Sequence, residues 1–398
     1  MANEEQIQSF RKQVRSYLME GSYSWEGLSK DNNYNSIYLI VAQECNAKCS
    51  YCYQPDVFRK KSVMTKEVAD TAVKFMNKTI GNRARFHLFG GEPLLNFDVV
   101  RYIVDKYPQV MFSMTTNGIV IDESVEVQEW IKSHRHHLDL TVSCSAQREF
   151  YGKDKYLKKI QPCIDIVKTN GGEFHFVVAD PFDTDLFSEI KYFFDSGVKM
   201  KISAANCGKI IATDEGLNAY VSLLKKVVDY LYFDDKPKFD ISTYDRVFKG
   251  SMAKKRKGTL DADAMSSLFC GCGHTYLAVT PTGDIYPCDY FSSFPEMKIG
   301  DIYGGMNNDA KFFTNMDEWT TTLYDCCKGC EIEDLRLCTR AHCLAENYEF
   351  NKHPFEPTKS HCNTNILEYR LFNYVLDEAE KRNMNITKLV PYKSRSLP

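Results

Sequence analysis

Residues 36–52 read SIYLIVAQECNAKCSYC, an apolar run followed by three cysteines. β-Branched and aromatic residues dominate 36–41, which predicts a buried strand. Cys45, Cys49 and Cys52 follow it with the spacing C-x3-C-x2-C. Such clustering is rare by chance in a chain that has 15 cysteines among 398 residues. The stretch therefore predicts a strand whose carboxyl end carries a metal or cluster site.

Composition narrows the class of protein. Hydrophobic residues make up 43% of the chain, and the formal net charge of −3 does not indicate a nucleic-acid partner. The one basic run, 254–257, is expected to be a solvated loop. No window approaches 18 apolar residues, and the N-terminus lacks an apolar stretch of signal length, so no membrane partner is expected. We therefore expect a cytoplasmic protein. Clustered cysteines in that reducing compartment indicate metal binding or catalysis.

Strand and helix patterns alternate six times, which predicts an α/β fold with a parallel sheet and outer helices. The predicted strands are 36–41, 85–89, 110–116, 138–144, 173–179 and 199–205, and the helices are 64–80, 96–106, 122–133, 156–169, 185–196 and 217–232. Chemistry in such folds lies at the carboxyl ends of the strands.

This periodicity ends near residue 245. Nine of the 15 cysteines lie between 270 and 362, and a last amphipathic helix is predicted over 366–381. We expect three parts: a helical N-terminal extension (1–35), the strand–helix domain (36–245) and a cysteine-rich domain with a C-terminal helix (246–398).

Two further loops follow predicted strands. GGEP (90–93) follows the second strand, and TTNG (115–118) follows the third. Glycines permit close backbone approach, although Gly-Gly is also an ordinary turn and Asn-Gly is the commonest hairpin dipeptide. Together with the cysteines, these loops place three unusual sequences on one predicted face.

The pattern Cys45-x3-Cys49-x-Tyr51-Cys52 resembles the hallmark of the radical S-adenosylmethionine (SAM) superfamily. The resemblance implies a partial (β/α)6 barrel and a [4Fe–4S] cluster that leaves one iron for SAM. It also implies reductive cleavage of SAM and abstraction of a hydrogen atom from substrate by the 5′-deoxyadenosyl radical. Zinc is the alternative for clustered cysteines, but it usually takes four ligands.

The same resemblance implies which residues bind the cofactor. GGEP and TTNG look like the family's motifs, Glu92 would pair with the SAM ammonium group, and Ser143 would contact the ribose. Ser143 is followed by Cys-Ser-Ala, where many relatives have Ser-x-Asp-Gly. Cys144, Cys163 and Cys207 are expected to be core residues. The implied cofactor-binding residues are Tyr51, Gly90, Gly91, Glu92, Pro93, Thr115, Asn117 and Ser143.

The C-terminal cysteines resemble the SPASM domain of peptide- and protein-maturing enzymes. Cys272-x10-Gly283-x4-Cys288 fits its pattern, whereas the spacings around Cys338 and Cys343 are longer. The resemblance implies two auxiliary [4Fe–4S] clusters. The first would have an open coordination site if Cys270 or Cys272 is not a ligand. Structural zinc is the alternative for these cysteines. The implied ligand sets are Cys270, Cys272, Cys288 and Cys343 for one cluster, and Cys327, Cys330, Cys338 and Cys362 for the other; Cys326 is a spare thiol.

The resemblance predicts a radical SAM maturase of a ribosomally made peptide or protein, which forms a thioether or carbon–carbon crosslink. Asp289 matches the base of anaerobic sulfatase maturases, although a surface carboxylate beside a ligand is equally plausible. Oxidation of Cys or Ser to formylglycine is the alternative reaction. A non-catalytic metal-binding partner protein is the alternative class. Expected partners are the peptide or protein substrate, an electron donor such as flavodoxin or ferredoxin, and a separate leader-peptide-binding protein.

Overall fold

The computed structural model describes most of the chain between residues 36 and 383. The described residues are 36–54, 56, 61–80, 84–205, 211–234, 272–273, 276–307, 329–332, 343–354 and 356–383. The predicted N-terminal helix, the basic run and Cys207, Cys270, Cys326, Cys327 and Cys338 lie outside them. The chain forms two compact units, Met1–Glu173, Phe269–Leu323 and Ala341–Thr358 in the first, and Phe174–Leu268, Tyr324–Arg340 and Lys359–Pro398 in the second.

The strands of the first unit form one sheet with a parallel centre. Their order is β11-β10-β9-β8-β1-β3-β4-β5, and β2 pairs with β1. β8, β1, β3, β4 and β5 run parallel, whereas β8 to β11 pair antiparallel. The strands are β1 Ser36–Gln43, β2 Ser62–Val63, β3 Arg85–Gly90, β4 Met111–Thr116, β5 Leu138–Ser143, β8 Tyr276–Val279, β9 Asp284–Tyr286, β10 Gly300–Asp301 and β11 Gly305–Met306. The carboxyl ends of β1, β3, β4 and β5 therefore meet at one edge.

Helices follow the strands of this unit. They are α3 Lys66–Ile80, η2 Pro93–Asn96, α4 Phe97–Lys106, α5 Ile119–Glu123, α6 Val125–Ser133, α7 Cys144–Tyr151, α8 Lys153–Lys159, α9 Gln161–Asn170, η4 Tyr290–Ser293, η5 Pro295–Met297 and α15 Leu344–Asn351. Thr65 caps α3 by accepting a 3.2 Å hydrogen bond from the Val68 N–H. The helix predicted over 156–169 is two helices, because Pro162 stands in the first turn of α9 and starts a new helix there.

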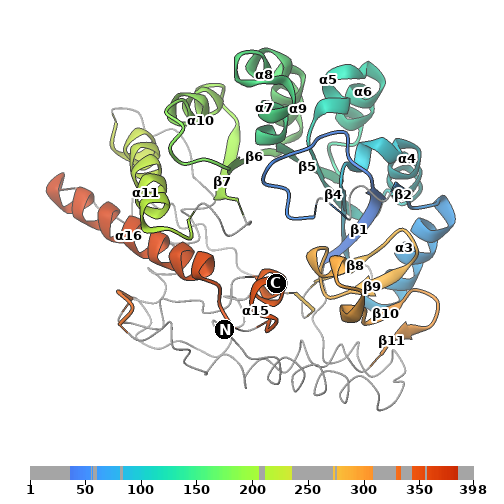
Figure 1. Ribbon diagram of the computed structural model, residues 1–398. Coiled ribbons are helices and arrows are strands. Elements are labelled where there is room, and N and C mark those ends of the chain that lie inside the picture. Colours follow the sequence, from blue (N-terminus) through green and yellow to red (C-terminus); the bar gives the residue numbers. More distant parts are fainter. Residues whose placement is uncertain are drawn as a thin grey trace. The chain divides into compact units, whose positions relative to one another are not determined.

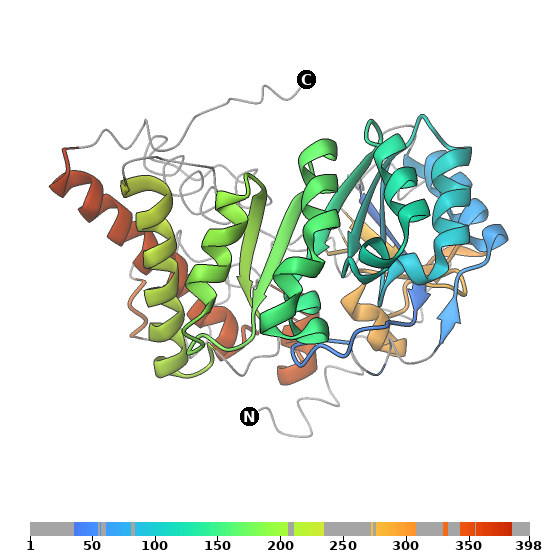
Figure 2. The same ribbon diagram turned by 90° about the horizontal axis from the view of Figure 1, so that it is seen from above.

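The core lies between the strands and the helices that follow them. Figures 1 and 2 show α4, α6 and α9 on one side of the strands. Alternate strand residues such as Phe86 and Phe112 are fully buried, as the period of a strand requires. Their neighbours on the other face are half-buried and more polar: His87 lies 2.7 Å from the Ser113 hydroxyl and 2.9 Å from the Thr115 hydroxyl. Burial lowers the pKa of His87 to about 4.

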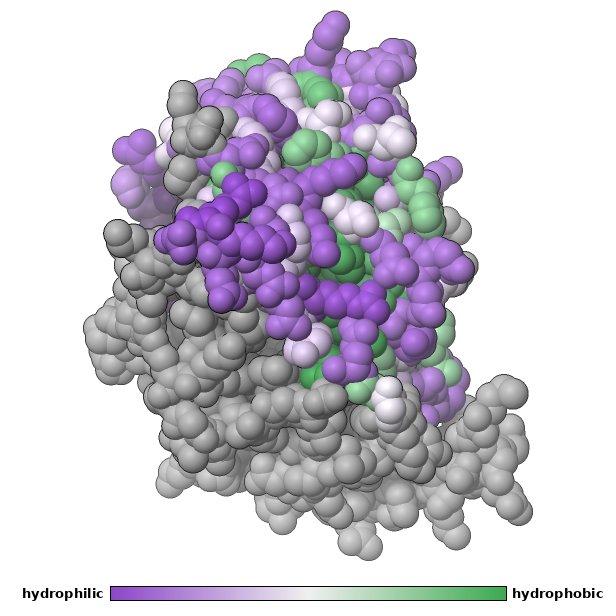
Figure 3. Space-filling model, turned by 90° about the vertical axis from the view of Figure 1, so that its left-hand side faces the viewer, coloured by the Kyte–Doolittle hydropathy of each residue, from purple (hydrophilic) through white to green (hydrophobic). Residues whose placement is uncertain are grey.

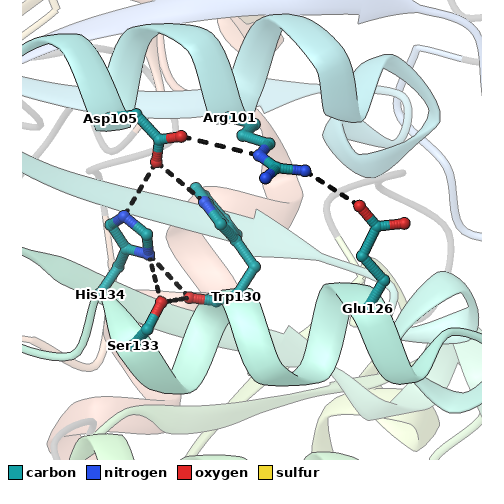
Figure 4. Close-up of polar contacts among 6 residues, drawn as sticks. All are labelled: Arg101, Asp105, Glu126, Trp130, Ser133 and His134. Atoms are coloured by element: carbon teal, nitrogen blue, oxygen red, sulfur yellow. Dashed lines mark hydrogen bonds and ion pairs between the residues drawn. The ribbon is translucent and has the colours of Figure 1, made fainter.

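Polar contacts join α4 to α6 outside this core (Figure 4). The Trp130 indole N–H donates to Asp105 over 3.0 Å, and His134 Nε2 lies 2.9 Å from the same carboxylate. Trp130 is buried, so this bond satisfies a donor that would otherwise be lost from water. Arg101 and Glu126 form an exposed ion pair, which contributes little to stability.

The second unit contains the last two strand–helix pairs and the C-terminal helix. Its elements are β6 Glu173–Val178 (which starts at the unit boundary), α10 Leu186–Asp195, β7 Lys199–Ala204, α11 Asp214–Val228, the π-helix η3 Asp229–Phe233 and α16 Lys359–Lys381. Helix α16 packs on α11, and the Tyr374 hydroxyl donates to Asp229 over 2.6 Å. It begins seven residues before its predicted start, so Cys362 lies in its first turn.

All six predicted strand–helix units are present, and the predicted α/β class is confirmed. Among the described residues, no helix combines the length and apolarity that crossing a membrane requires. The coloured part of the surface in Figure 3 is mostly hydrophilic, with hydrophobic residues interspersed.

Phe86→Ala is expected to lower the free energy of unfolding by about 3–5 kcal/mol, because it removes a fully buried ring from the centre of the sheet. Phe350→Ala is the matched control, since Phe350 is 54% exposed, and it should change stability by less than about 0.5 kcal/mol. Denaturant unfolding measures both. Equal losses in the two variants would contradict the described core.

Candidate cluster and cofactor site

The cysteine loop directly follows β1. Cys45, Cys49 and Cys52 are half-buried, and the Ala47 N–H donates to Cys45 Sγ over 3.4 Å. Burial raises the pKa of Cys45 to about 11 and that of Cys49 to about 12. These two thiols therefore favour the neutral form unless a cation stabilises the thiolates, and iron ions do so. The three residues fit a bound cluster.

The two glycines of GGEP carry the second loop against the cysteine loop. The Gly91 N–H donates to the Ala42 carbonyl over 2.9 Å, and the Glu92 N–H donates to the Glu44 carbonyl over 2.8 Å. A Cβ on Gly91 would lie 2.4 Å from the Glu44 oxygen and 2.9 Å from the Cβ of Cys45. Gly90 has a φ of +143°, which strains other residues. The motif is therefore a close backbone contact with the cysteine loop.

Glu92 joins the second loop to the third. Its buried carboxylate accepts hydrogen bonds from the Leu94 N–H (3.0 Å), the Thr116 hydroxyl (2.8 Å) and the Asn117 N–H (2.7 Å). Burial raises the pKa of Glu92 to about 7 although these bonds favour the ionised form. Pro93 follows and begins η2.

Asn117 joins the third loop to the first. Its Nδ2 donates to the Asn46 Oδ1 over 2.8 Å and lies 3.8 Å from Cys45 Sγ. Gly118, with a φ of +78°, leads into α5, so Asn-Gly here is a strand–helix turn between parallel strands. Thr115 points to the other face of the strand and contacts His87, whereas Thr116 contacts Glu92.

Helix α7 adds contacts that the sequence did not predict. The Tyr51 hydroxyl donates to the Ser145 hydroxyl over 3.0 Å, two residues beyond Ser143 at the end of β5. The Ser50 N–H and hydroxyl both donate to Glu149, over 2.7 Å each. Their signal in the sequence is weak, because Ser and Glu are common on helix surfaces.

The segment after Cys288 packs against the cysteine loop within the first unit. The Tyr53 hydroxyl donates to Asp289 Oδ2 over 2.6 Å. The Gln54 amide donates to the Asp289 carbonyl over 2.8 Å and to Ser293 Oγ over 2.7 Å. Burial raises the pKa of Asp289 above its ordinary value, against the effect of the Tyr53 bond. Tyr53 and Gln54 were missed, although they directly follow Cys52.

The described C-terminal cysteines divide between the two units. Cys272 and Cys288 are buried and Cys343 is half-buried in the first unit, whereas Cys330 and Cys362 are half-buried in the second. The two ligand sets remain predictions. Within the described ranges, no three His, Cys, Asp or Glu side chains are arranged around a single metal ion. A cubane cluster does not need that arrangement, because its cysteines bind different irons.

Gly91→Ala is expected to lower the iron bound after anaerobic reconstitution, because its Cβ would displace the backbone at Glu44 and Cys45. Gly304→Ala is the control, since the nearest atom to its Cβ is the Asp301 carboxylate at 3.4 Å. Iron analysis and circular dichroism measure loading and folding. A Gly91 variant that folds and binds as much iron as the parent protein would contradict the close approach.

Comparisons with known proteins find matches to part of this chain. Residues 39–187 match the model of the radical SAM superfamily. "Radical SAM cyclopropyl synthase TigE" of Paramaledivibacter caminithermalis is 22% identical over 205 residues, 44% of this chain and 42% of that protein. "FeMo cofactor biosynthesis protein NifB" of Azotobacter vinelandii is 28% identical over 120 residues, 27% of this chain and 24% of that protein. The chain thus spans less than half the length of these relatives.

Two solved structures resemble most of the chain. Native anSMEcpe with bound AdoMet and Cp18Cys peptide has a TM-score of 0.61 at 18% identity, with 87% of this chain and 99% of that chain covered. Streptococcus suis SuiB bound to precursor peptide SuiA has a TM-score of 0.58 at 14% identity, with 91% and 82% covered. These likenesses support the fold of the radical SAM partial barrel. Over residues 39–187, the chain is thus similar to the radical SAM superfamily of enzymes.

Proposed function

We propose that the protein cleaves SAM reductively and abstracts a hydrogen atom from a peptide or protein substrate, forming a thioether or carbon–carbon crosslink. The observation that carries the proposal is the meeting of three loops at Cys45. Gly91 leaves no room for a side chain beside it, and Asn117 approaches its sulfur. Glu92 holds the second and third loops together. SAM binding accounts for all three loops.

Each residue has a proposed role in this site. Cys45, Cys49 and Cys52 would hold a [4Fe–4S] cluster, which supplies the electron that breaks the sulfonium C–S bond of SAM. Gly90 and Gly91 bring the backbone close. Glu92 Oε2 accepts a hydrogen bond from the Asn117 N–H. An ionised carboxylate oxygen can accept more than one hydrogen bond, so the same atom can pair with the SAM ammonium group. Tyr51, Pro93, Thr115, Asn117 and Ser143 complete the proposed cofactor site.

A peptide is the proposed class of substrate. Two of the similar solved structures contain a peptide, Cp18Cys in one and the precursor SuiA in the other. Asp289 is the proposed base, and its contact with Tyr53 places it beside the cysteine loop. Oxidation of Cys or Ser to formylglycine is the second candidate reaction, because that same base would serve it.

The C-terminal region (246–398) is proposed to be a SPASM-type domain with two auxiliary [4Fe–4S] clusters. The placement of five ligand candidates in two units supports two separate sites. Their other proposed ligands, Cys270, Cys327 and Cys338, complete sets of four. An electron donor such as flavodoxin or ferredoxin, and a leader-peptide-binding protein, are the proposed partners.

SAM cleavage tests the enzymatic proposal against a non-catalytic metal-binding protein. The reconstituted, dithionite-reduced protein is expected to form 5′-deoxyadenosine, measured by chromatography with mass detection. Cys45→Ala should abolish this product, because the cluster loses a ligand. Cys144→Ala is the matched control, since Cys144 is a buried cysteine on α7, and it should retain the product. Absence of 5′-deoxyadenosine from the parent protein would favour the non-catalytic class.

Iron content tests the auxiliary clusters separately. About twelve irons per chain are expected from three cubane clusters after anaerobic reconstitution. Cys288→Ala should lower this number by up to about four and leave the loop of Cys45 loaded. A parent protein with about four irons and bound zinc would remove the two auxiliary clusters from the proposal.

A further inference from the structure

Helix α8 presents a basic face to solvent. Lys155, Lys158 and Lys159 are exposed and stand at i, i+3 and i+4, which places them on one side of the helix. Tyr156 in α8 and Ile160 at its C-cap are fully buried and hold the helix against the unit. The direction of the three ammonium groups is therefore set by the packing of α8.

An exposed aromatic residue adjoins this face. Phe150, at the end of α7, is 47% exposed, and its ring meets that of Tyr151 edge-to-face with centroids 4.9 Å apart. Lys159 Nζ lies 5.8 Å from the centre of the Tyr151 ring, within cation–π range. We name Phe150, Lys155, Lys158 and Lys159 the α7–α8 surface.

The charge of this region differs from that of the chain. Residues 148–159 hold five cationic side chains and two acidic ones, a local excess of three positive charges, whereas the whole chain has a net charge of −3. One of the acidic residues, Glu149, accepts both hydrogen bonds from Ser50. Its charge is therefore turned toward the cysteine loop.

Helix α7, which carries Phe150 of the α7–α8 surface, also contacts the cysteine loop. Ser50, which binds Glu149, stands between Cys49 and Tyr51 in the sequence. Tyr51 in turn binds Ser145 in the first turn of α7. A protein that rests on Phe150 and the lysines therefore reaches the segment that carries the proposed cluster ligands.

We propose that the α7–α8 surface docks a small acidic one-electron carrier protein of the flavodoxin or ferredoxin class. The inference rests on the proposed function, because reductive cleavage of SAM consumes one electron, which the reduced carrier gives up as it is oxidised. Positive charges attract an acidic carrier and speed its encounter, and a partly exposed ring is a typical anchor of an interface. The rival occupant, an acidic segment of the peptide substrate, is distinguished by the test below.

The first measurement is binding of an oxidised acidic flavodoxin to the reconstituted protein, followed by flavin fluorescence. The double variant Lys155→Glu/Lys158→Glu is expected to bind about tenfold more weakly at about 0.05 M salt. The difference should shrink near 1 M salt, where the Debye length falls to about 3 Å. Lys132→Glu/Arg135→Glu is the matched control, because these residues precede β5, at the opposite edge of the sheet from the cysteine loop. Equal binding by both double variants would overturn the inference.

The second measurement separates this inference from the proposed function. With reduced flavodoxin, the Lys155/Lys158 variant should form 5′-deoxyadenosine about tenfold more slowly than the control variant. With dithionite, the two should be equal. An equal loss with both reductants, while flavodoxin binding is unchanged, would reject the docking surface in favour of a substrate role for the lysines. Absence of product from the parent protein with dithionite would reject the proposed function itself. Phe150→Ala should weaken flavodoxin binding with little change in its salt dependence, because it removes contact area and no charge.

Discussion

The site depends on one buried carboxylate. Glu92 accepts three hydrogen bonds, two from backbone N–H groups and one from Thr116, and they come from both sides of the gap between the second and third loops. Such charge-assisted bonds are short and strong, and a buried carboxylate without them would be costly. The position of Asn117, and through it the environment of Cys45, follows from this arrangement. A change at Glu92 would therefore disturb the geometry of the loops as well as any contact with a ligand.

Close packing supplies the second constraint. The backbone at Gly91 lies so near Glu44 and Cys45 that a methyl group would overlap them. Parallel pairing of β1 and β3 brings these loops to the same edge of the sheet, and the missing side chains let them touch. The backbone at Gly91 thus limits the space on one side of the cysteine loop. The thiols of Cys45 and Cys49 favour the neutral form until a metal ion stabilises the thiolates. The fold sets the shape of the site, and a bound cluster would supply the positive charge that stabilises the thiolates.

Two groups of hydrogen bonds connect this loop with other parts of the first unit. Tyr53 and Gln54 hold the segment after Cys288, so the neighbours of a proposed auxiliary ligand touch the neighbours of Cys52. Ser50 and Tyr51 hold α7, next to the α7–α8 surface. The loop therefore contacts both the proposed base, Asp289, and the helix next to the proposed docking surface. The residues that make these contacts directly precede and directly follow Cys52 in the sequence.

The sequence by itself determined the α/β class, the six strand–helix units and the three loops, because strand and helix periodicity, cysteine spacing and glycine pairs are local signals. Only the tertiary structure decided which member of each motif does what: Thr116 contacts Glu92, whereas Thr115 turns to His87. It also decided that α16 begins at Lys359, that β8 pairs with β1, and that Tyr53, Gln54, Ser145 and Glu149 belong to the site. These facts join residues separated by as many as 240 positions, as in the pairing of Ser36 with Tyr276. No local pattern encodes such contacts, because they arise when packing brings distant elements together.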